Sequence, residues 1–518
     1  MAEPPSKRRR LSDTNEDHTN QKSGELPASL SHPISPPRKR VARERKLISS
    51  PFQLTTIKDL PKEQNVDAVS LRDILGDPLI AECWEFNYLH DVDFLMSHFD
   101  EDTRSLVKVH IVHGFWKKDD YNRLSLEQQS GQYNNVTLHA AYMPEMFGTH
   151  HSKMLVLFRH DDTAQVIIHT ANMISKDWTN MTNGVWQTPR LPRLANPQNH
   201  AESHMSIGNG PRFKADLLNY LRAYNTKRQI CKSMVEELEK YDFSAVRGAL
   251  IASVPGRHDV NEDDPGKTLW GWAGIKHTLR SVPVQAGESE VVVQISSIAT
   301  LGATDSWLQN TLFKSLSPAR TNTPKPKFKI IFPTPDEIRR SLDGYASGGS
   351  IHMKIQSATQ MKQLQYMRPV LHHWANDCEK GTIEEGGIQD GGRKRAAPHI
   401  KTYIRYNENK SIDWALLTSA NISKQAWGET ANGFGQMRIA SWEIGVLVWP
   451  ELFDDKARMV GTFMKDTPAK EDLDGDGPLV GLRIPYSLPL QKYGDSEVPW
   501  VATASYTVPD WMGRIWGG

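Results

Sequence analysis

The stretch Gly148-Thr149-His150-His151-Ser152-Lys153-Met154 decides the fold of this 518-residue chain, because a second stretch repeats its key residues. The second stretch is Pro398-His399-Ile400-Lys401-Thr402-Tyr403, and both contain His-x-Lys. An apolar, strand-like run follows each copy and ends in an Ala-Asn pair. Asn172 lies 21 positions after His151, and Asn421 lies 22 positions after His399. A single His-x-Lys says little, but two with matched spacing predict a duplicated half-site.

The repeat continues beyond each asparagine. Ser, Lys and Trp follow the first copy at Ser175, Lys176 and Trp178, and the second copy at Ser423, Lys424 and Trp427. This similarity favours two related domains over a chance match.

Length and composition favour two or three domains and no membrane span. The chain is longer than an ordinary single domain, and its 38% hydrophobic residues suffice for sizeable cores. The sequence contains no run of about 18 apolar residues that could span a bilayer. Its polar, basic N-terminus lacks the apolar core of a secretory signal. Cys83, Cys231 and Cys378 lack metal-ligand spacing, so we expect a reducing compartment and no disulfide framework.

Charge is distributed unevenly along the chain. The net charge is +1, but residues 1–46 hold eleven Lys or Arg and six Asp or Glu, which leaves a net −4 for the remainder. Residues 1–55 are rich in Ser, Pro and charge, and we expect a disordered tail. Its clusters Lys7-Arg8-Arg9-Arg10 and Arg38-Lys39-Arg40 are of nuclear-localisation type and predict a nuclear protein. A solvated basic tail is the alternative, and any nucleic-acid surface must be a local patch.

Strand and helix patterns alternate after residue 70, which predicts an α/β layer architecture. Expected strands are 107–112, 154–158, 166–169, 250–253, 291–295, 329–332, 414–418 and 444–449, and expected helices are 213–224 and 232–241. A boundary near residue 245 divides the chain into 56–245, with the first His-x-Lys, and 246–518, with the second. Residues 381–397 are rich in Gly and charge and predict a flexible insertion. From about residue 470, Pro, Gly and Trp predict irregular surface structure.

Two histidines, two lysines and two asparagines suit phosphoryl transfer without a metal. A neutral imidazole can attack phosphorus, while an imidazolium can protonate the leaving oxygen. Lys153, Lys401 and the two asparagine amides would stabilise negative charge on the phosphoryl oxygens. Since His151 and His399 are 248 positions apart, a cleft shared by two similar domains is required.

Three other interpretations of these residues stay open. Each His-x-Lys could be surface decoration, and the chain could be a non-catalytic DNA-binding protein that keeps a dead site. Zinc is the third interpretation, with ligands drawn from His150, His151, His169 and His399. Cysteine and carboxylate ligands at suitable spacings are absent from the sequence, which disfavours zinc.

The paired pattern resembles the phospholipase D superfamily and, within it, the tyrosyl-DNA phosphodiesterase family. The resemblance covers the chain from about residue 70 to the C-terminus and rests on Phe147-Gly148-Thr149-His150-His151-Ser152-Lys153-Met154, His169-Thr170-Ala171-Asn172, Pro398-His399-Ile400-Lys401-Thr402-Tyr403, Thr418-Ser419-Ala420-Asn421-Ile422-Ser423-Lys424 and Ser441-Trp442-Glu443-Ile444-Gly445-Val446. It implies an α/β fold of two similar α/β/α domains with mixed sheets. A pseudo-two-fold axis would relate them, with the active site at their interface.

One departure separates the chain from general phospholipases. Their motif places Asp five residues after the Lys, where Phe158 and Tyr406 stand here. This favours the tyrosyl-DNA branch over a phospholipase D-like lipid phosphodiesterase, which is the alternative function. In that branch a Glu and a Gln orient the two histidines. Glu443 matches the Glu, and Asn183 stands at the Gln position with a side chain one methylene shorter.

The resemblance implies a DNA-repair phosphodiesterase acting on the 3′-phosphotyrosyl bond between DNA and a topoisomerase I-derived peptide. His151 would attack phosphorus and form a phosphohistidine. His399 would protonate the tyrosine oxygen and then activate the water that leaves a 3′-phosphate. The resemblance also implies nuclease and exonuclease activity, binding of single- and double-stranded DNA, no cofactor, no metal and no membrane partner. We expect a monomer.

Substrate contacts follow from the same resemblance. Ser296, Ser297, Ser423 and Lys424 match positions that contact DNA phosphates. Phe147 and Tyr88 would stack on bases or wall the cleft, with core packing as the alternative. On the peptide side stand Arg257, for which a turn-stabilising role is equally plausible, and Trp500.

Overall fold

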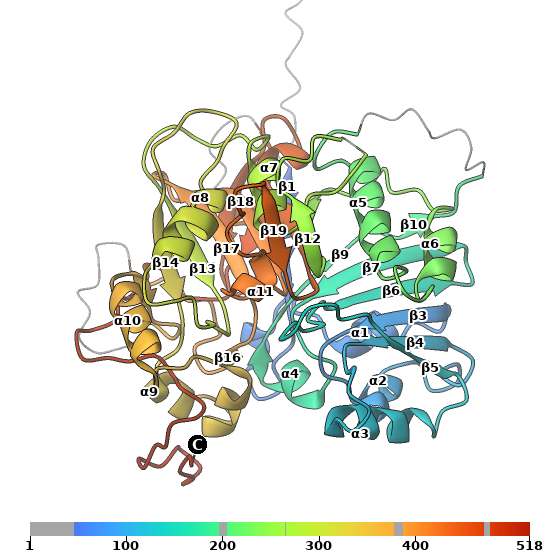
Figure 1. Ribbon diagram of the computed structural model, residues 1–518, viewed down its shortest axis with the longest axis horizontal. Helices are drawn as coiled ribbons and strands as arrows, with labels where there is room; N and C mark the ends of the chain where they lie inside the picture. The colour runs from blue at the N-terminus through green and yellow to red at the C-terminus, as the bar shows by residue number, and fades with distance from the viewer. Residues whose placement is uncertain (1–45, 196–204, 265, 378–386, 471–476, 518) are drawn as a thin grey trace, which may run out of the picture. The chain divides into compact units, whose positions relative to one another are not determined.

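Two mixed β-sheets carry the two copies of the repeat (Figure 1). The computed structural model describes residues 46–195, 205–264, 266–377, 387–470 and 477–517. The first sheet has eight strands, with β10 (Leu191–Pro192) paired to β7, in the order β2 (Gln53–Leu54), β9 (Gly184–Gln187), β7 (Thr163–His169), β6 (Met154–Arg159), β3 (Ile80–Phe86), β4 (Lys108–His113) and β5 (Val136–Ala140).

The second sheet has ten strands. Its order is β1 (Leu47–Ile48), β22 (Leu479–Arg483), β21 (Arg458–Thr462), β18 (Ser411–Thr418), β17 (Thr402–Asn407), β13 (Ser289–Gln294), β14 (Lys327–Ile331) and β15 (Leu371–His372). In addition, β20 (Glu443–Val448) pairs with β18, and β11 (Ala249–Ser253) pairs with β20. The predicted boundary near residue 245 falls just before β11; whether the halves are separate domains stays a prediction.

The sheets repeat one topology. In the first, β3 is antiparallel to β6 and parallel to β4, β6 is antiparallel to β7, and β4 is parallel to β5. In the second, β13, β14, β15, β17 and β18 show the same order and directions. Both sets also follow the same sequence order. The expected pair of similar α/β halves with mixed sheets is therefore confirmed.

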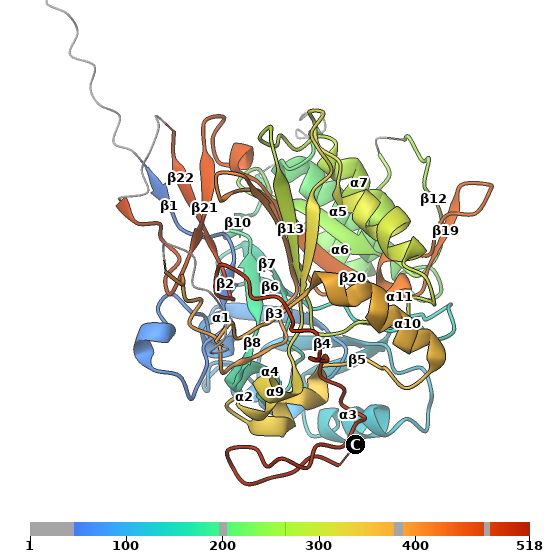
Figure 2. The same cartoon turned by 90° about the vertical axis from the view of Figure 1, so that its left-hand side faces the viewer.

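Helices cover the outer faces of the sheets, while a shared apolar core joins the inner faces. Near the first sheet lie α1 (Leu71–Leu75), α2 (Val92–Ser97) and α3 (Tyr121–Ser130), and on the second lie α7 (Gly271–Leu279), α8 (Lys314–Leu316) and α10 (Ala358–Met367) (Figures 1 and 2). The shared core includes Val156, Phe158 and Ile168 from the first sheet with Ile404 and Leu417 from the second. This burial of apolar surface from both sheets stabilises one fixed arrangement around the cleft.

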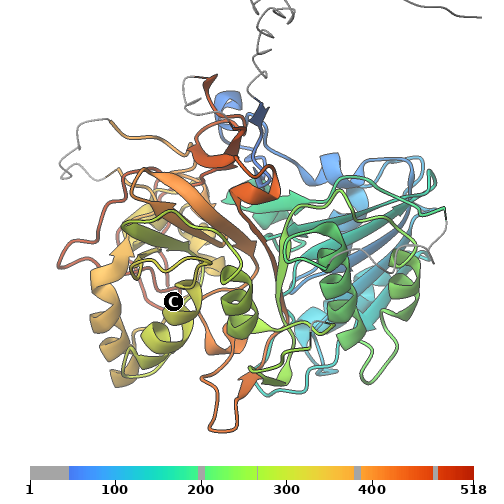
Figure 3. The same cartoon turned by 90° about the horizontal axis from the view of Figure 1, so that it is seen from above.

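The described residues contain five further α-helices: α4 (Ser175–Thr179), α5 (Gly210–Ala223), α6 (Lys232–Leu238), α9 (Pro335–Arg339) and α11 (Lys424–Trp427). The predicted helix at 213–224 begins earlier than expected because Asn209 caps α5, accepting a hydrogen bond from the Arg212 N–H at 2.9 Å, with Pro211 in the first turn. The helix predicted at 232–241 is α6. The eight predicted strands are confirmed within a few residues. Both α5 and α7 contact β11, and Figure 3 shows them on opposite sides of this strand.

The predicted tail is too long at its C-terminal end. Strand β1 pairs in parallel with β22, and β2 pairs antiparallel with β9, so residues 47–54 belong to the sheets. Phe52 and Leu54 are buried in the shared core and hold this segment against the sheets. The polar residues around them obscured this contribution in the sequence. The tail prediction for residues 1–45 lies outside the described residues.

Two other expectations need correction. The C-terminal stretch contains β22, a buried strand paired with β21, and is not only irregular surface. The predicted insertion at 381–397 lies partly outside the described residues. Its later part packs tightly, since Arg393 is fully buried and donates to Asn65 Oδ1 at 3.0 Å. Within the described ranges, no helix is both long enough and apolar enough to cross a membrane.

Candidate active site

The duplicated topology places the two half-sites at equivalent strand ends. His151 and Lys153 immediately precede β6, and Asn172 follows β7; because these strands are antiparallel neighbours, all three lie at one edge of the first sheet. His399, Lys401 and Asn421 occupy the same places around β17 and β18. The similar spacing from His to Asn in the two copies thus corresponds to two antiparallel strands and the turn that joins them.

Each half-site is built onto the opposite half of the molecule. The His151 N–H donates to the Trp442 carbonyl at 3.0 Å, and the Trp442 N–H donates to the Thr149 carbonyl at 2.9 Å. On the other side, β16 (Ala397–Pro398) pairs with β8 (Met181–Thr182), and the His399 N–H donates to the Thr182 carbonyl at 3.0 Å. These reciprocal backbone bonds fix both histidines relative to one another.

A buried carboxylate orients His151. Glu443 Oε2 lies 2.9 Å from His151 Nδ1 and also accepts a hydrogen bond from the Ser419 hydroxyl. Burial alone would raise the pKa of Glu443, but His151, Ser419 and Lys153 bring it below its ordinary value. An ionised Glu443 can only accept, so the proton is on Nδ1 and Nε2 keeps its lone pair. Burial lowers the pKa of His151, which keeps the ring neutral and nucleophilic near pH 7.

Two acceptors orient His399, and sequence reasoning missed one of them. Asn183 Oδ1 lies 3.0 Å from His399 Nδ1, close enough for a direct bond despite the shorter side chain. Asp177 Oδ2 lies 3.2 Å from the same nitrogen and is fully buried. Asp177 is five residues after Asn172, and no sequence pattern distinguishes it from a helix-surface acid. A carboxylate therefore faces the second imidazole from a different position than the phospholipase Asp.

The two lysines bring positive charge to the site and donate hydrogen bonds to its backbone. Lys153 Nζ donates to the His151 carbonyl at 3.1 Å, and Lys401 Nζ donates likewise to the His399 carbonyl. Burial lowers the pKa of Lys153 to about 8 and lowers that of Lys401 well below its ordinary value. Burial, Lys401 and Lys153 also lower the pKa of His399 strongly. A bound phosphodiester anion would reverse these shifts, because it supplies the negative charge that the cluster lacks.

The asparagines present amide hydrogens to the cleft from both halves. Asn421 Oδ1 accepts from the Ser296 N–H at 3.1 Å and the Ser297 N–H at 2.9 Å, which leaves its NH₂ group for another acceptor. Asn172 Nδ2 donates to Asp177 Oδ2 at 2.9 Å and keeps a second hydrogen. Asp177 thus links an amide donor to the imidazole of His399.

A single cavity of about 350 Å³ collects most of the predicted residues. Its lining includes both histidines, both asparagines and Glu443, together with Tyr88, Phe147, Ser296, Ser297 and Ser423. Phe147 is 81% exposed and Tyr88 is 37% exposed, so neither packs in the core as the alternative supposed. The Tyr88 ring centroid lies 5.7 Å from that of His151. The cavity walls thus offer aromatic faces next to the hydrogen-bond donors.

Three predicted contacts lie outside the lining of this cavity. Lys424 stands beside Ser423 at the start of α11. Arg257 is exposed on β12 (Gly256–Asp259), which forms a separate two-stranded ribbon with β19 (Gln436–Ile439) and extends away from the sheets in Figure 2. Trp500 is fully buried and donates from Nε1 to the Gly348 carbonyl at 3.0 Å, so it supports the wall from behind.

Residues that would favour other chemistries are engaged elsewhere. His150 Nδ1 lies 2.7 Å from the Asn87 carbonyl and its Nε2 lies 3.0 Å from the Tyr224 hydroxyl, so neither nitrogen is available to zinc. Among the residues that the structure describes, no group of three or more His, Cys, Asp or Glu is arranged to hold a metal ion. Phe158 and Tyr406 are both buried in the core, and the Tyr406 hydroxyl lies 3.1 Å from the Tyr486 hydroxyl.

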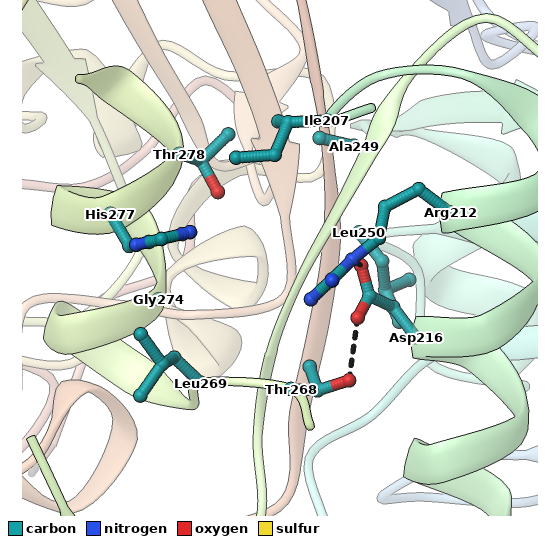
Figure 4. Close-up of a pocket in the computed structure, with 10 residues that line it drawn as sticks. All are labelled: Ile207, Arg212, Asp216, Ala249, Leu250, Thr268, Leu269, Gly274, His277 and Thr278. Atoms are coloured by element: carbon teal, nitrogen blue, oxygen red, sulfur yellow. Dashed lines mark hydrogen bonds and ion pairs between the residues drawn. The ribbon is translucent and has the colours of Figure 1, made fainter. Parts of the chain in front are cut away.

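A second cavity lies between α5 and α7 and has no part in this site (Figure 4). Its volume is about 20 Å³, which suits roughly one water molecule. Thr268 donates to Asp216 at 2.5 Å beside it, and His277 faces it from α7. This volume excludes a substrate, whereas the cavity of about 350 Å³ is lined by both histidines and both asparagines and is the candidate active site.

Comparison with known proteins agrees with this geometry. The family model described as tyrosyl-DNA phosphodiesterase matches residues 51–494. A probable tyrosyl-DNA phosphodiesterase of Schizosaccharomyces pombe is 30% identical, over 93% of this chain and 98% of the relative. Tyrosyl-DNA phosphodiesterase 1 of Drosophila melanogaster is also 30% identical, over 86% of this chain and 73% of the relative.

The fold matches as well. The crystal structure of the yeast tyrosyl-DNA phosphodiesterase superposes with a TM-score of 0.63 at 20% identity, covering 87% of this chain and 98% of that one. The family match spans both His-x-Lys copies and both sheets. The chain therefore belongs to the tyrosyl-DNA phosphodiesterase family, a family of phosphodiester hydrolases with the phospholipase D fold.

Proposed function

We propose that this protein is a DNA-repair enzyme that hydrolyses the bond between a DNA 3′-phosphate and the tyrosine of a topoisomerase I-derived peptide, through a phosphohistidine intermediate. One observation carries the proposal: two imidazoles line one cavity, and each is held through Nδ1 by acceptors of the opposite half. Each ring thereby keeps Nε2 for a phosphate placed between them.

In the first step, Nε2 of His151 attacks phosphorus and the P–O bond to tyrosine breaks. Protonated His399 gives its proton to the departing oxygen, which would otherwise leave as an anion. The lysine ammonium groups and the amides of Asn172 and Asn421 stabilise the charge that develops on the phosphoryl oxygens. Glu443 stabilises the positive charge that appears on the imidazole of His151.

In the second step, His399 is neutral because it has lost its proton. It takes a proton from a water molecule, whose oxygen attacks phosphorus and breaks the P–N bond to His151. The products are a DNA 3′-phosphate and the regenerated histidine pair. One chain contains both imidazoles, so a monomer suffices. The DNA strand would lie along Ser296, Ser297 and Ser423, with bases against Phe147 and Tyr88.

We expect the purified protein to release tyrosine from a 3′-phosphotyrosyl oligonucleotide in the presence of EDTA, because every charge that the steps require comes from side chains. Gel electrophoresis would follow conversion to the 3′-phosphate. Vesicles of phosphatidylcholine serve as the alternative substrate. Release of choline without cleavage of the oligonucleotide would contradict the proposal and favour the lipid phosphodiesterase. Loss of cleavage with EDTA would contradict the metal-free mechanism.

Replacing Asp177 with asparagine should shift the pH dependence of the first step. A carboxylate 3.2 Å from Nδ1 stabilises the imidazolium form of His399. Its removal lowers the pKa of His399, so the rate should begin to fall at a pH about one unit lower, and near pH 8 it should be up to about tenfold lower than in the unmodified protein. Single-turnover release of tyrosine between pH 5 and pH 9 would measure the shift.

A matched control is available for this variant. Asp343 makes no hydrogen bond to His399 within the described residues. Its carboxylate accepts a hydrogen bond from Asn180 Nδ2 at 2.9 Å. Asp343→Asn should leave the pH profile unchanged. An Asp177→Asn profile that is uniformly lower but unshifted would show that Asp177 only supports Asn172.

The nuclear location is also part of the proposal. It is supported by the two basic clusters at Lys7–Arg10 and Arg38–Arg40, both outside the described residues. Fluorescence microscopy of the tagged chain, with both clusters changed to alanine as the comparison, would test it.

A further inference from the structure

Lys176 belongs to the repeated sequence but has no part in the steps above. It corresponds to Lys424 of the second copy and stands one residue before Asp177 in α4. Its ammonium lies against Gly349, where a Cβ would stand 3.4 Å from Lys176 Nζ. Gly349 lines the active-site cavity, so the absence of a side chain there leaves the ammonium next to the cleft.

The ammonium of Lys176 is not neutralised by an ion pair. Among the described residues, no carboxylate lies within 4.0 Å of Lys176 Nζ and no side-chain hydrogen bond engages it. The Asp177 carboxylate instead accepts a hydrogen bond from Asn172 and faces His399, and the Asp343 carboxylate accepts a hydrogen bond from Asn180. Burial lowers the pKa of Lys176, while Asp177 and Asp343 raise it in part. A partly buried cation without a partner is stabilised by an anionic ligand.

His352 is a third imidazole in the same cavity. Its backbone is fixed between two strand-end residues: the His352 N–H donates to the Ser296 carbonyl at 2.9 Å, and its carbonyl accepts from the Ile298 N–H at 2.9 Å. Burial, Lys176 and Lys354 lower the pKa of His352, so the ring is neutral near pH 7 and can donate one hydrogen bond. The proposed steps give it no role.

The positions of both residues correspond to the leaving group. In an in-line displacement the leaving oxygen is opposite the nucleophile, and therefore next to His399. His352 and His399 line the same cavity, and Lys176 Nζ lies against Gly349 of that lining. Lys176 also directly precedes Asp177, whose carboxylate lies 3.2 Å from His399 Nδ1. Lys424, the counterpart of Lys176, stands beside Ser423 on the side assigned to DNA. The duplication thus provides one lysine for the DNA strand and one for the group that departs.

We propose that Lys176 and His352 form an anion-binding subsite for the leaving group, which takes a carboxylate attached to the tyrosyl adduct. Lys176 supplies the charge and His352 a hydrogen bond. This subsite would make the enzyme select among adducts by their charge close to the tyrosine, and it rests on the proposed function.

The test compares two oligonucleotides that differ only in this charge. One carries 3′-phospho-N-acetyltyrosine, with a carboxylate, and the other carries 3′-phospho-N-acetyltyrosinamide, which is neutral; the phenol oxygens are equivalent. We expect kcat/KM to be about fivefold higher for the carboxylate, the size of a partly exposed ion pair. Lys176→Met should reduce this ratio to about one, while Lys176→Arg should retain it. His352→Phe should reduce it in part.

Controls separate the subsite from the rest of the site. Lys424→Met should lower kcat/KM for both oligonucleotides by the same factor. In the unmodified protein the ratio should fall as salt rises from about 0.05 to 0.5 M, since screening weakens the ion pair. This measurement needs no variant to fold. A ratio that is unaffected by Lys176→Met and by salt would overturn the subsite. Failure to cleave either oligonucleotide would instead contradict the proposed function.

Discussion

Replacing His151 with asparagine should lower the single-turnover rate by about 10⁴-fold or more, because the variant has no nitrogen able to bond to phosphorus. Asparagine is smaller than histidine and can still accept or donate at the position facing Glu443, so the cavity and the reciprocal backbone bonds persist. Substrate binding should change little, which a fluorescence-anisotropy titration with the oligonucleotide would show. The loss should therefore fall on the chemical step.

The covalent adduct provides a second readout for the same variant. Quenching the unmodified enzyme with denaturant during turnover should trap DNA on the protein, and the bond should be labile in acid and stable in alkali, as expected for a phosphorus–nitrogen bond. The His151→Asn variant should yield no such adduct. His160→Asn, which removes an exposed imidazole from the turn after β6, is the matched control and should behave as the unmodified protein. An adduct of undiminished yield on His151→Asn would assign the nucleophile to another residue.

The duplicated motif allowed the two half-sites of the candidate active site to be predicted from the sequence. His-x-Lys precedes a strand and Asn ends the next one, so a fixed number of residues separates them in both halves. Glu443 was identifiable only through the family resemblance, because a lone Glu before an apolar strand is common. Short apolar runs predicted strands in both sheets, because strands that are buried on both faces, such as β6 and β20, are mostly apolar.

The missed features all depend on contacts between distant segments. Asp177 lies in a short polar helix, and its role comes from a partner, His399, that is 222 positions away. Residues 47–54 have too few apolar side chains to predict strands, and they pair only because β9 and β22 offer free edges. The family resemblance placed Trp500 on the peptide side of the cleft, but its ring is fully buried behind Gly348. Local patterns carry no information about such pairings.

The second histidine should reveal itself by trapping the intermediate. In His399→Asn, the first step should slow moderately with a tyrosine leaving group, since its oxygen departs without a proton. The second step should slow more, by about 10²- to 10⁴-fold, because no base remains to activate water. Covalent enzyme–DNA should then accumulate during turnover, and denaturing gel electrophoresis with labelled DNA would measure its fraction against the unmodified enzyme.

The choice of leaving group makes this prediction sharper. With 4-nitrophenol in place of tyrosine the anion departs readily, so the first step in His399→Asn should approach that of the unmodified enzyme, and accumulation should be nearly complete. The Asp177→Asn variant loses a carboxylate that contacts the His399 ring, but it retains His399 itself. It should therefore accumulate much less of the adduct. If His399→Asn accumulated no adduct with either leaving group while still turning over, His399 would not be the base for the second step. If it lost the first step equally with both, His399 would act mainly by positioning the phosphate, because an acid is not needed for 4-nitrophenol. The predicted division of labour requires that the two leaving groups differ in the first step and agree in the second.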